Sequence, residues 1–94
     1  MAKATFKNIV LAESNDTILL EGIHYFPPES INRQYLVESD THAVCSWKGT
    51  AKHFHVVVGD DTARDAAWFY PDPPRAAATI ADHVAFRGDV EVTP

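Results

Sequence analysis

Two histidines separated by one residue are the first feature that could carry chemistry. His53 and His55 lie in a segment, residues 50–58, that is predicted to form a strand. Side chains two residues apart on a strand point to one face, so one strand would offer two imidazoles to a metal. A third ligand would have to come from elsewhere, for example His24, His42 or Asp61. Two histidines alone are a weak metal signature, so we favour histidines on the solvent face with Phe54 in the core, and predict no metal.

Cys45, the single cysteine, is the second candidate. A nucleophilic thiolate needs a nearby base or cation, and Lys48 and the histidines are close in sequence. A lone cysteine that follows Ala43 and Val44 in a predicted strand is more typical of a small buried hydrophobe. We therefore predict no catalytic residue, and keep an enzyme that depends on a metal or on cysteine and histidine as an alternative.

Three carboxylates lie close together in sequence, at Asp60, Asp61 and Asp65. Carboxylates can hold a divalent cation, but the alternating acids and distal glutamate of a calcium loop are missing. A solvated acidic loop is the better interpretation. The four glycines form neither of the usual phosphate-binding loops, so we predict no cofactor.

Aromatic side chains beside turns form the fourth candidate site. Strand ends in small β-domains are places where a pocket can open, and aromatic walls with one cation suit a small apolar or anionic ligand. We predict a ligand-binding site formed by Glu21, Tyr25, Trp47, Lys48, His53, Trp68 and Tyr70. The alternative is that these rings only fill the core of a domain too small to bury them elsewhere.

Short strands broken by turn residues must position these side chains. We expect a first hairpin that turns at residues 14–16, a further turn at residues 39–41, and a hairpin that turns at Lys48-Gly49. Short helical turns are expected after Pro28 and over residues 75–81, and a C-terminal hairpin over residues 84–92. The pattern predicts an all-β fold of about seven short strands in a single domain, residues 1–94.

Composition narrows the function classes. The 94 residues are 46% hydrophobic, which is typical of a globular domain. Eight basic and 13 acidic residues give a net charge of −5, which argues against a nucleic-acid-binding face. No apolar run approaches the length of a membrane span or of a signal peptide, and one cysteine allows no internal disulfide. We expect a soluble cytoplasmic protein that binds neither membrane nor nucleic acid.

Three separated segments resemble a known family. Residues 45–54, CSWKGTAKHF, resemble a C-x-[YW]-K-G-x-A-x-Y-[YW] signature, with His53 in place of a tyrosine. Residues 67–73, AWFYPDP, resemble a W-x-Y-x-x-P element. Ile80 with residues 84–87, VAFR, resembles an I-x-x-x-V-A-F-Y element, with Arg87 in place of the tyrosine. In this order and spacing, the segments are similar to those of the family called domain of unknown function 427, over essentially the whole chain.

The resemblance implies a small domain of the β-tent type, related in shape to methionine sulfoxide reductase B and the thalidomide-binding domain of cereblon. Those relatives usually carry paired C-x-x-C zinc ligands, which a chain with one cysteine cannot supply. A nucleotidyltransferase-like label attached to the family adds that activity to the enzyme alternatives, although the G-S…D-x-D constellation is absent. Our leading hypothesis is a domain that binds a small molecule, and the third alternative is a structural or interaction domain that acts as a homodimer.

Overall fold

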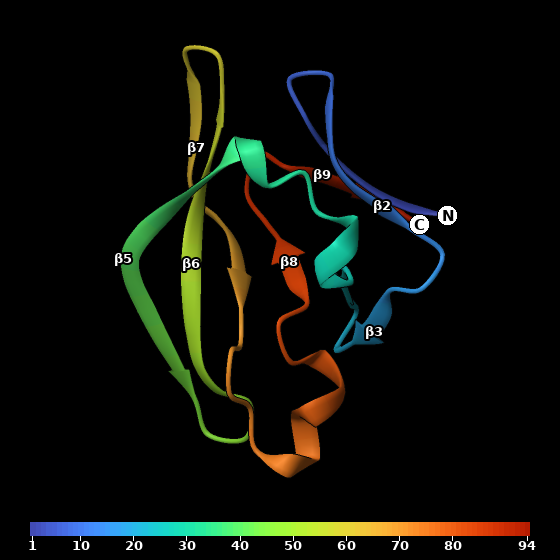
Figure 1. Cartoon of the computed structure of the whole chain (residues 1–94), viewed down its shortest axis with the longest axis vertical. Coiled ribbons are helices and arrows are strands. Elements are labelled where there is room, and N and C mark those ends of the chain that lie inside the picture. The colour runs from blue at the N-terminus through green and yellow to red at the C-terminus, as the bar shows by residue number, and fades with distance from the viewer.

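Nine strands and three short 3-10 helices make up the fold (Figure 1), which a computed structural model describes for residues 1–94. The strands are β1 (Ala2–Phe6), β2 (Ile9–Ser14), β3 (Ile18–Leu20), β4 (Ile23–Tyr25), β5 (Leu36–Cys45), β6 (Gly49–Val58), β7 (Asp61–Phe69), β8 (Val84–Phe86) and β9 (Glu91–Thr93). The helices are η1 (Pro28–Ser30), η2 (Arg33–Tyr35) and η3 (Arg75–Ile80). The predicted all-β class is therefore confirmed, with nine strands where about seven were expected.

The strands form three antiparallel sheets. Their orders are β2-β1-β9, β3-β4 and β5-β6-β7-β8. The small β3-β4 sheet continues the largest sheet past β8, because the backbones of Phe26 and Val84 exchange two hydrogen bonds of 2.8 and 2.9 Å. The two chain ends lie side by side (Figure 1), since Lys3 of β1 pairs with Thr93 of β9.

Alternate residues of the largest sheet enter two separate apolar clusters. Ala67 and Phe69 of β7 pack with the strands of the β2-β1-β9 sheet, whereas Trp68 packs with Tyr25 of β4 and Ile80 of η3. Successive side chains on a strand point to opposite faces, so the clusters lie on opposite sides of the sheet. We call these sides the Phe69 face and the Trp68 face, and the predicted site residues lie on the second.

Two tight turns determine which strands pair near the N-terminus. Phe6 pairs with Ile9 and Leu20 with Ile23, so each hairpin has a loop of two residues. Both residues of each loop have positive φ, at Lys7-Asn8 and at Glu21-Gly22. Two consecutive positive φ angles are the mark of a type I′ turn, whose twist matches that of the flanking strands.

Two of the hairpins predicted from the sequence do not form. The first one turns at residues 7–8 rather than 14–16, and β3 pairs with β4 instead of returning along β2. The C-terminal strands β8 and β9 do not pair with each other: β8 joins β7, and β9 joins β1. The first error shifts the pairing to the next strand along the chain, whereas β9 pairs with a strand from the opposite end of the chain.

The turn expected at residues 39–41 is a β-bulge inside the ten-residue strand β5. Glu38 pairs with Phe54 and His42 with Lys52, so three residues of β5 face one of β6. A second irregularity lies in β7, between residues paired to Phe54 and Val56 of β6. Bulges bend and twist a strand, and these two lie on either side of β6 where the predicted histidines are located.

The helical turns predicted after Pro28 and over residues 75–81 are confirmed as the 3-10 helices η1 and η3. None of the three helices has the length and apolar character needed to cross a bilayer.

Candidate functional site

Lys48 is the charged centre of the Trp68 face. It lies in the three-residue loop between β5 and β6, where Cys45 pairs with Gly49, and only 11% of its side chain is exposed. Its ammonium forms a short ion pair with the Glu21 carboxylate. Its Nζ atom also lies 5.5 Å from the ring centre of Trp47 and 5.8 Å from that of Tyr70, within the range of cation–π attraction.

Backbone conformation positions both members of this ion pair. Glu21 has a φ of +55° in the type I′ turn, which projects its side chain from the end of the β3-β4 hairpin. Gly49 follows Lys48 with a φ of +95°, and a Cβ atom there would lie 3.4 Å from the Asp72 carbonyl oxygen. Glycine at this position therefore lets the loop fold close to the segment after β7.

Burial and neighbours set the charge state of Lys48. Desolvation acts to lower the pKa of its ammonium, but the hydrogen bond to Glu21, helped by the Tyr25 and Tyr70 hydroxyls, outweighs it and raises the pKa. Desolvation likewise raises the pKa of the Tyr70 hydroxyl, against the pull of Lys48. Lys48 is thus a fixed cation and Tyr70 a neutral hydrogen-bonding group at neutral pH.

A shallow cleft of about 160 Å3 opens beside Lys48. Tyr25, Trp68 and Tyr70 provide its aromatic walls, and the rings of Tyr25 and Trp68 meet edge to face with centres 6.4 Å apart. Tyr25 is fully buried, and its hydroxyl is the one buried side-chain polar atom in the structure without a hydrogen-bond partner. We call this feature the Lys48 cleft; its other lining residues are Ile23, Ala43, Lys48, Ala51, His53 and Arg87.

Five of the seven residues in the predicted site therefore line one cleft. The other two, Glu21 and Trp47, contact Lys48 but do not line it. The prediction missed Arg87, which lies at the end of β8 with its guanidinium carbon 5.7 Å from the Trp68 ring centre. The one signal for it in the sequence is its place in the third motif, where arginine stands for tyrosine. His53, another departure from the motifs, lines the same cleft.

The two histidines of β6 have different surroundings. His53 is buried, with 5% of its surface exposed, so its expected position on the solvent face is wrong. His55 is half-buried and lies opposite the bulge of β7. His53 donates from Nδ1 to the Thr41 carbonyl oxygen at 3.2 Å, whereas His55 Nδ1 accepts the Asp65 backbone N–H at 3.0 Å. The two rings thus belong to different hydrogen-bond pairs.

Asp65 lies in the bulge of β7 and contacts the bulge of β5 across β6. Its carboxylate accepts hydrogen bonds from the hydroxyls of Ser39 and Thr41, and these bonds lower the pKa of Asp65. His55 Nδ1 lies 3.7 Å from this carboxylate, but that nitrogen carries no proton because it accepts the backbone N–H of Asp65. The contact is therefore not an ion pair, and Asp65 acts as a structural clamp that holds β5 against β7.

Comparison with known families now identifies the chain. Residues 1–93 match the family described as Domain of unknown function (DUF427). The chain belongs to the DUF427 family. The resemblance read from the three motifs is confirmed over nearly the whole chain. A comparison with curated proteins gave no match for this DUF427 domain.

Cys45 of the DUF427 domain is partly exposed rather than buried, contrary to expectation. Backbone N–H groups of Trp47 and then of Lys48 point at its sulfur, and they lower the pKa of the thiol. None of the five histidine rings bonds to Cys45: their partners are Thr17, Asp40, Thr41, Asp65 and Ala81. The loop backbone thus favours the thiolate form of Cys45, and no histidine is paired with it as a base.

The candidate metal ligands are dispersed in this DUF427 domain. No group of three or more histidine, cysteine, aspartate or glutamate side chains gathers anywhere in residues 1–94. Asp61 faces a different part of the molecule from the histidines. It lines a hollow between the β1-β2 turn, the β6-β7 turn and the loop before β9.

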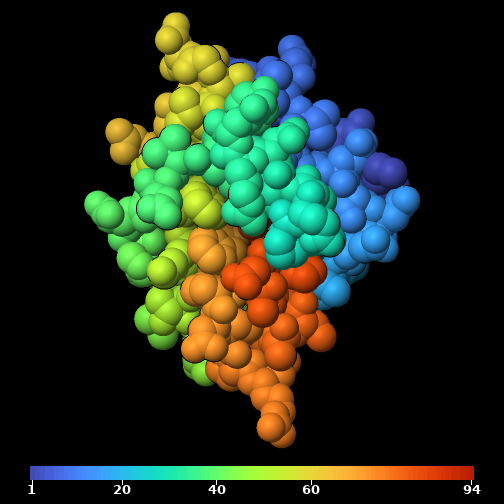
Figure 2. All heavy atoms as spheres, viewed as in Figure 1, coloured from blue at the N-terminus to red at the C-terminus, as the bar shows by residue number.

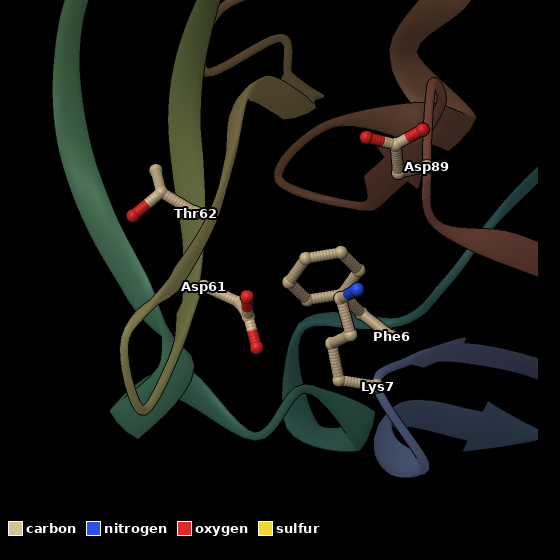
Figure 3. A pocket seen from close by; sticks show the side chains of 5 residues that line it. All are labelled: Phe6, Lys7, Asp61, Thr62 and Asp89. Atoms are coloured by element: carbon tan, nitrogen blue, oxygen red, sulfur yellow. The ribbon is translucent and has the colours of Figure 1, made fainter.

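That hollow is the largest in the DUF427 domain, at about 420 Å3. Figure 2 shows the two turns as separate prominences at the top of the view, yellow near residue 60 and blue near residue 7. In Figure 3 the Phe6 ring lies at the centre of the hollow with Lys7 against it, while Asp61, Thr62 and Asp89 come from the other segments. Phe6 is its one hydrophobic lining residue, and no residue of the predicted site lies in it.

A third hollow, of about 260 Å3, lies where β5 bulges away from β6. Its lining includes His42, Lys52 and the stacked rings of Phe54 and Phe69, whose centres are 5.2 Å apart. His53 lines both this hollow and the Lys48 cleft. Of the three hollows, the Lys48 cleft alone combines a buried hydroxyl without a partner with aromatic walls and a nearly buried cation.

Proposed function

We propose that this DUF427 domain binds a small molecule in the Lys48 cleft and acts as a binding module. The observation that carries the proposal is the Tyr25 hydroxyl, which is fully buried and has no hydrogen-bond partner in the protein. A buried hydroxyl without a partner costs about 1–3 kcal/mol. Tyr25 lines the cleft, so a ligand atom that reaches this hydroxyl through a small shift of the lining would accept its hydrogen bond and recover that free energy.

The rest of the lining supports the same function. Ligand sites are mostly apolar and aromatic, with a few polar groups that fix orientation. The Lys48 cleft has two tyrosine rings and one tryptophan ring as walls, with Lys48, His53 and Arg87 as polar groups. Its volume of about 160 Å3 equals roughly five water molecules, so the ligand, or the part of it that enters, is small.

A homodimer through β5 is the less favoured alternative. β5 lies at an edge of its sheet, and Val37 and Val44 on it are 49% and 83% exposed. A bulge interrupts the strand, and Glu38 and Asp40 add negative charge to it, features that oppose edge-to-edge pairing. Sedimentation analysis of the full chain tests this alternative, since a dimer through β5 would have twice the mass of the 10.4 kDa chain.

Thermal-shift screening of small organic compounds tests the binding function. A compound that prefers the native state raises the apparent melting temperature. We expect at least one class of compound to raise the melting temperature of the wild-type chain but not that of the Tyr25→Phe variant. Tyr35→Phe is the matched control, because Tyr35 is half-buried in η2 and packs against the other apolar cluster. A screen without stabilising compounds, or equal shifts for wild type and Tyr25→Phe, would contradict the proposal.

A further inference from the structure

One of the two cations that line the Lys48 cleft has no carboxylate partner. Lys48 is paired with Glu21, but Arg87, the second cation of the lining, forms no ion pair in the structure. The chain as a whole carries a net charge of −5. A lone positive charge beside aromatic walls in an acidic protein indicates that the cleft selects its ligand by charge as well as by shape.

The Arg87 side chain is held in one orientation. Its Nε atom donates to the Asp65 carbonyl oxygen at 2.9 Å, and its guanidinium carbon lies 5.7 Å from the Trp68 ring centre. These contacts use one of the five N–H groups of the guanidinium. The terminal nitrogens form no hydrogen bond within the chain, so they remain available in the fork geometry that matches a carboxylate.

The other side of the cleft is lined by Tyr25 and His53. The Tyr25 hydroxyl has no partner within the chain, and the Nδ1 atom of His53 donates to a backbone carbonyl, so its Nε2 atom is the one that remains for a ligand. Trp68 contacts both sides, because its ring meets Tyr25 edge to face and lies under Arg87. A ligand across Trp68 would therefore meet the Arg87 cation at one end and the polar groups of Tyr25 and His53 at the other.

We infer that the ligand of the Lys48 cleft is a small monocarboxylate whose carboxylate pairs with Arg87 over the Trp68 ring. This inference rests on the proposed binding function. The cleft has one uncompensated positive charge, so a second carboxylate would lie unpaired near Glu21. The volume of about 160 Å3 restricts the enclosed part to roughly four to six non-hydrogen atoms. Propionate and butyrate have this size and charge.

The test is a titration of the full-length chain with sodium propionate and with propionamide, its neutral analogue of equal size, at constant ionic strength. Binding is followed by NMR through the backbone amide of Arg87 and the indole N–H of Trp68. We expect propionate to bind at least about tenfold more tightly than propionamide, a difference of about 1.4 kcal/mol. Succinate, a dicarboxylate, is expected to bind more weakly than propionate.

Substitutions of Arg87 and Arg64 test whether Arg87 causes the preference for propionate. Arg87→Ala is expected to abolish the preference for propionate, and Arg87→Lys to retain part of it, because lysine keeps the charge without the fork. Arg64→Ala is the matched control, since Arg64 is exposed on β7 and does not line the cleft. Arg87 is itself exposed, so its replacement is expected to leave the fold intact, which thermal unfolding verifies.

Three outcomes would overturn the inference. Equal binding of propionate and propionamide would show that charge does not select the ligand, and small-molecule binding would still stand. An unchanged preference in Arg87→Ala would remove Arg87 from the site. The absence of binding by both compounds would exclude a small monocarboxylate, and if the thermal-shift screen also found no compound, the binding function would fail with it.

Discussion

The two faces of the largest sheet are both aromatic but are built differently. On the Phe69 face, Phe26 is fully buried and meets Phe86 edge to face, with ring centres 5.7 Å apart. Every large side chain at its centre is apolar. On the Trp68 face, the equivalent central ring is Tyr25, equally buried, whose hydroxyl has no partner. The buried groups of the Phe69 face find all their partners within the chain, whereas on the Trp68 face one buried hydroxyl has none.

This difference separates a face that is packed only by apolar groups from the face on which we propose the binding site. Apolar side chains need only close packing, which the Phe69 face achieves with side chains from two sheets. The Trp68 face holds Lys48, His53 and Tyr25 in burial that is unfavourable for polar groups. Natural proteins tolerate such local costs mainly at functional sites.

Loss of a central ring should cost far more on the Phe69 face than on the Trp68 face. Phe26→Ala is expected to lower the free energy of unfolding by about 3–5 kcal/mol, because it leaves a cavity in closely packed surroundings. Trp68→Ala should cost less than about 2 kcal/mol, since Trp68 is only partly buried and borders a cleft. Urea denaturation of both variants measures the difference. Equal losses would show that the Trp68 face is as much a core as the other.

Removal of the Tyr25 hydroxyl should stabilise the protein in the absence of ligand. Tyr25→Phe eliminates a buried group without a partner and keeps the ring, so we expect a gain of about 1 kcal/mol. In a domain of this size that gain would raise the melting temperature by roughly 4–8 °C. Tyr35→Phe should give no such gain. A loss of stability in Tyr25→Phe would mean that the hydroxyl has a hydrogen-bond partner, and the contrast between the two faces would disappear.

The class of the fold and five residues that line the Lys48 cleft were predicted from the sequence, whereas the strand pairing was predicted less well. Lys48-Gly49 was identified as a hairpin turn because glycine favours positive φ, and strand-end aromatic residues led to Tyr25, Trp68 and Tyr70. The first hairpin was wrong because type I′ turns are formed by Lys7-Asn8 and Glu21-Gly22, and the last was wrong because β8 pairs with β7 and β9 with β1. Lysine and glutamate at positive φ are uncommon, so composition gives little warning of such turns.

The bulges could not be predicted from strand periodicity. Three residues of β5 and three of β7 face single residues of β6, and Asp65 bridges the two bulges through Ser39 and Thr41. Asp65 is far from Ser39 and Thr41 in sequence, and their contact depends on the pairing of β5, β6 and β7. Arg87 was missed for a similar reason, since it reaches Trp68 only because β8 pairs with β7.

The Asp65 clamp should make the stability of the domain sensitive to acid. The folded-state pKa of Asp65 is lowered, so its contribution to stability is fully present above the unfolded-state value of about 4 and is lost as the pH falls through the folded-state pKa. Asp65→Asn should therefore be less stable than wild type at neutral pH, and the difference should shrink in acid. Asparagine tolerates the φ of +52° at this position, so the substitution removes the charge of Asp65 without straining the backbone. Urea denaturation from pH 7 down to about pH 2 measures both curves; a constant difference would exclude the clamp.

Neutralisation of Glu21 should affect ligand selection more than stability. Glu21 is half-exposed, with 51% of its side chain accessible, so its ion pair with Lys48 is screened and Glu21→Gln should cost less than about 1 kcal/mol. The same change removes the negative charge from the edge of the Lys48 cleft and leaves both Lys48 and Arg87 without a carboxylate. Propionate should then bind more tightly, and succinate should gain more than propionate because its second carboxylate can pair with Lys48. If the variant instead lost several kcal/mol and bound neither compound better, the ion pair would be a stabilising element, and the Trp68 face would resemble the Phe69 face in its role.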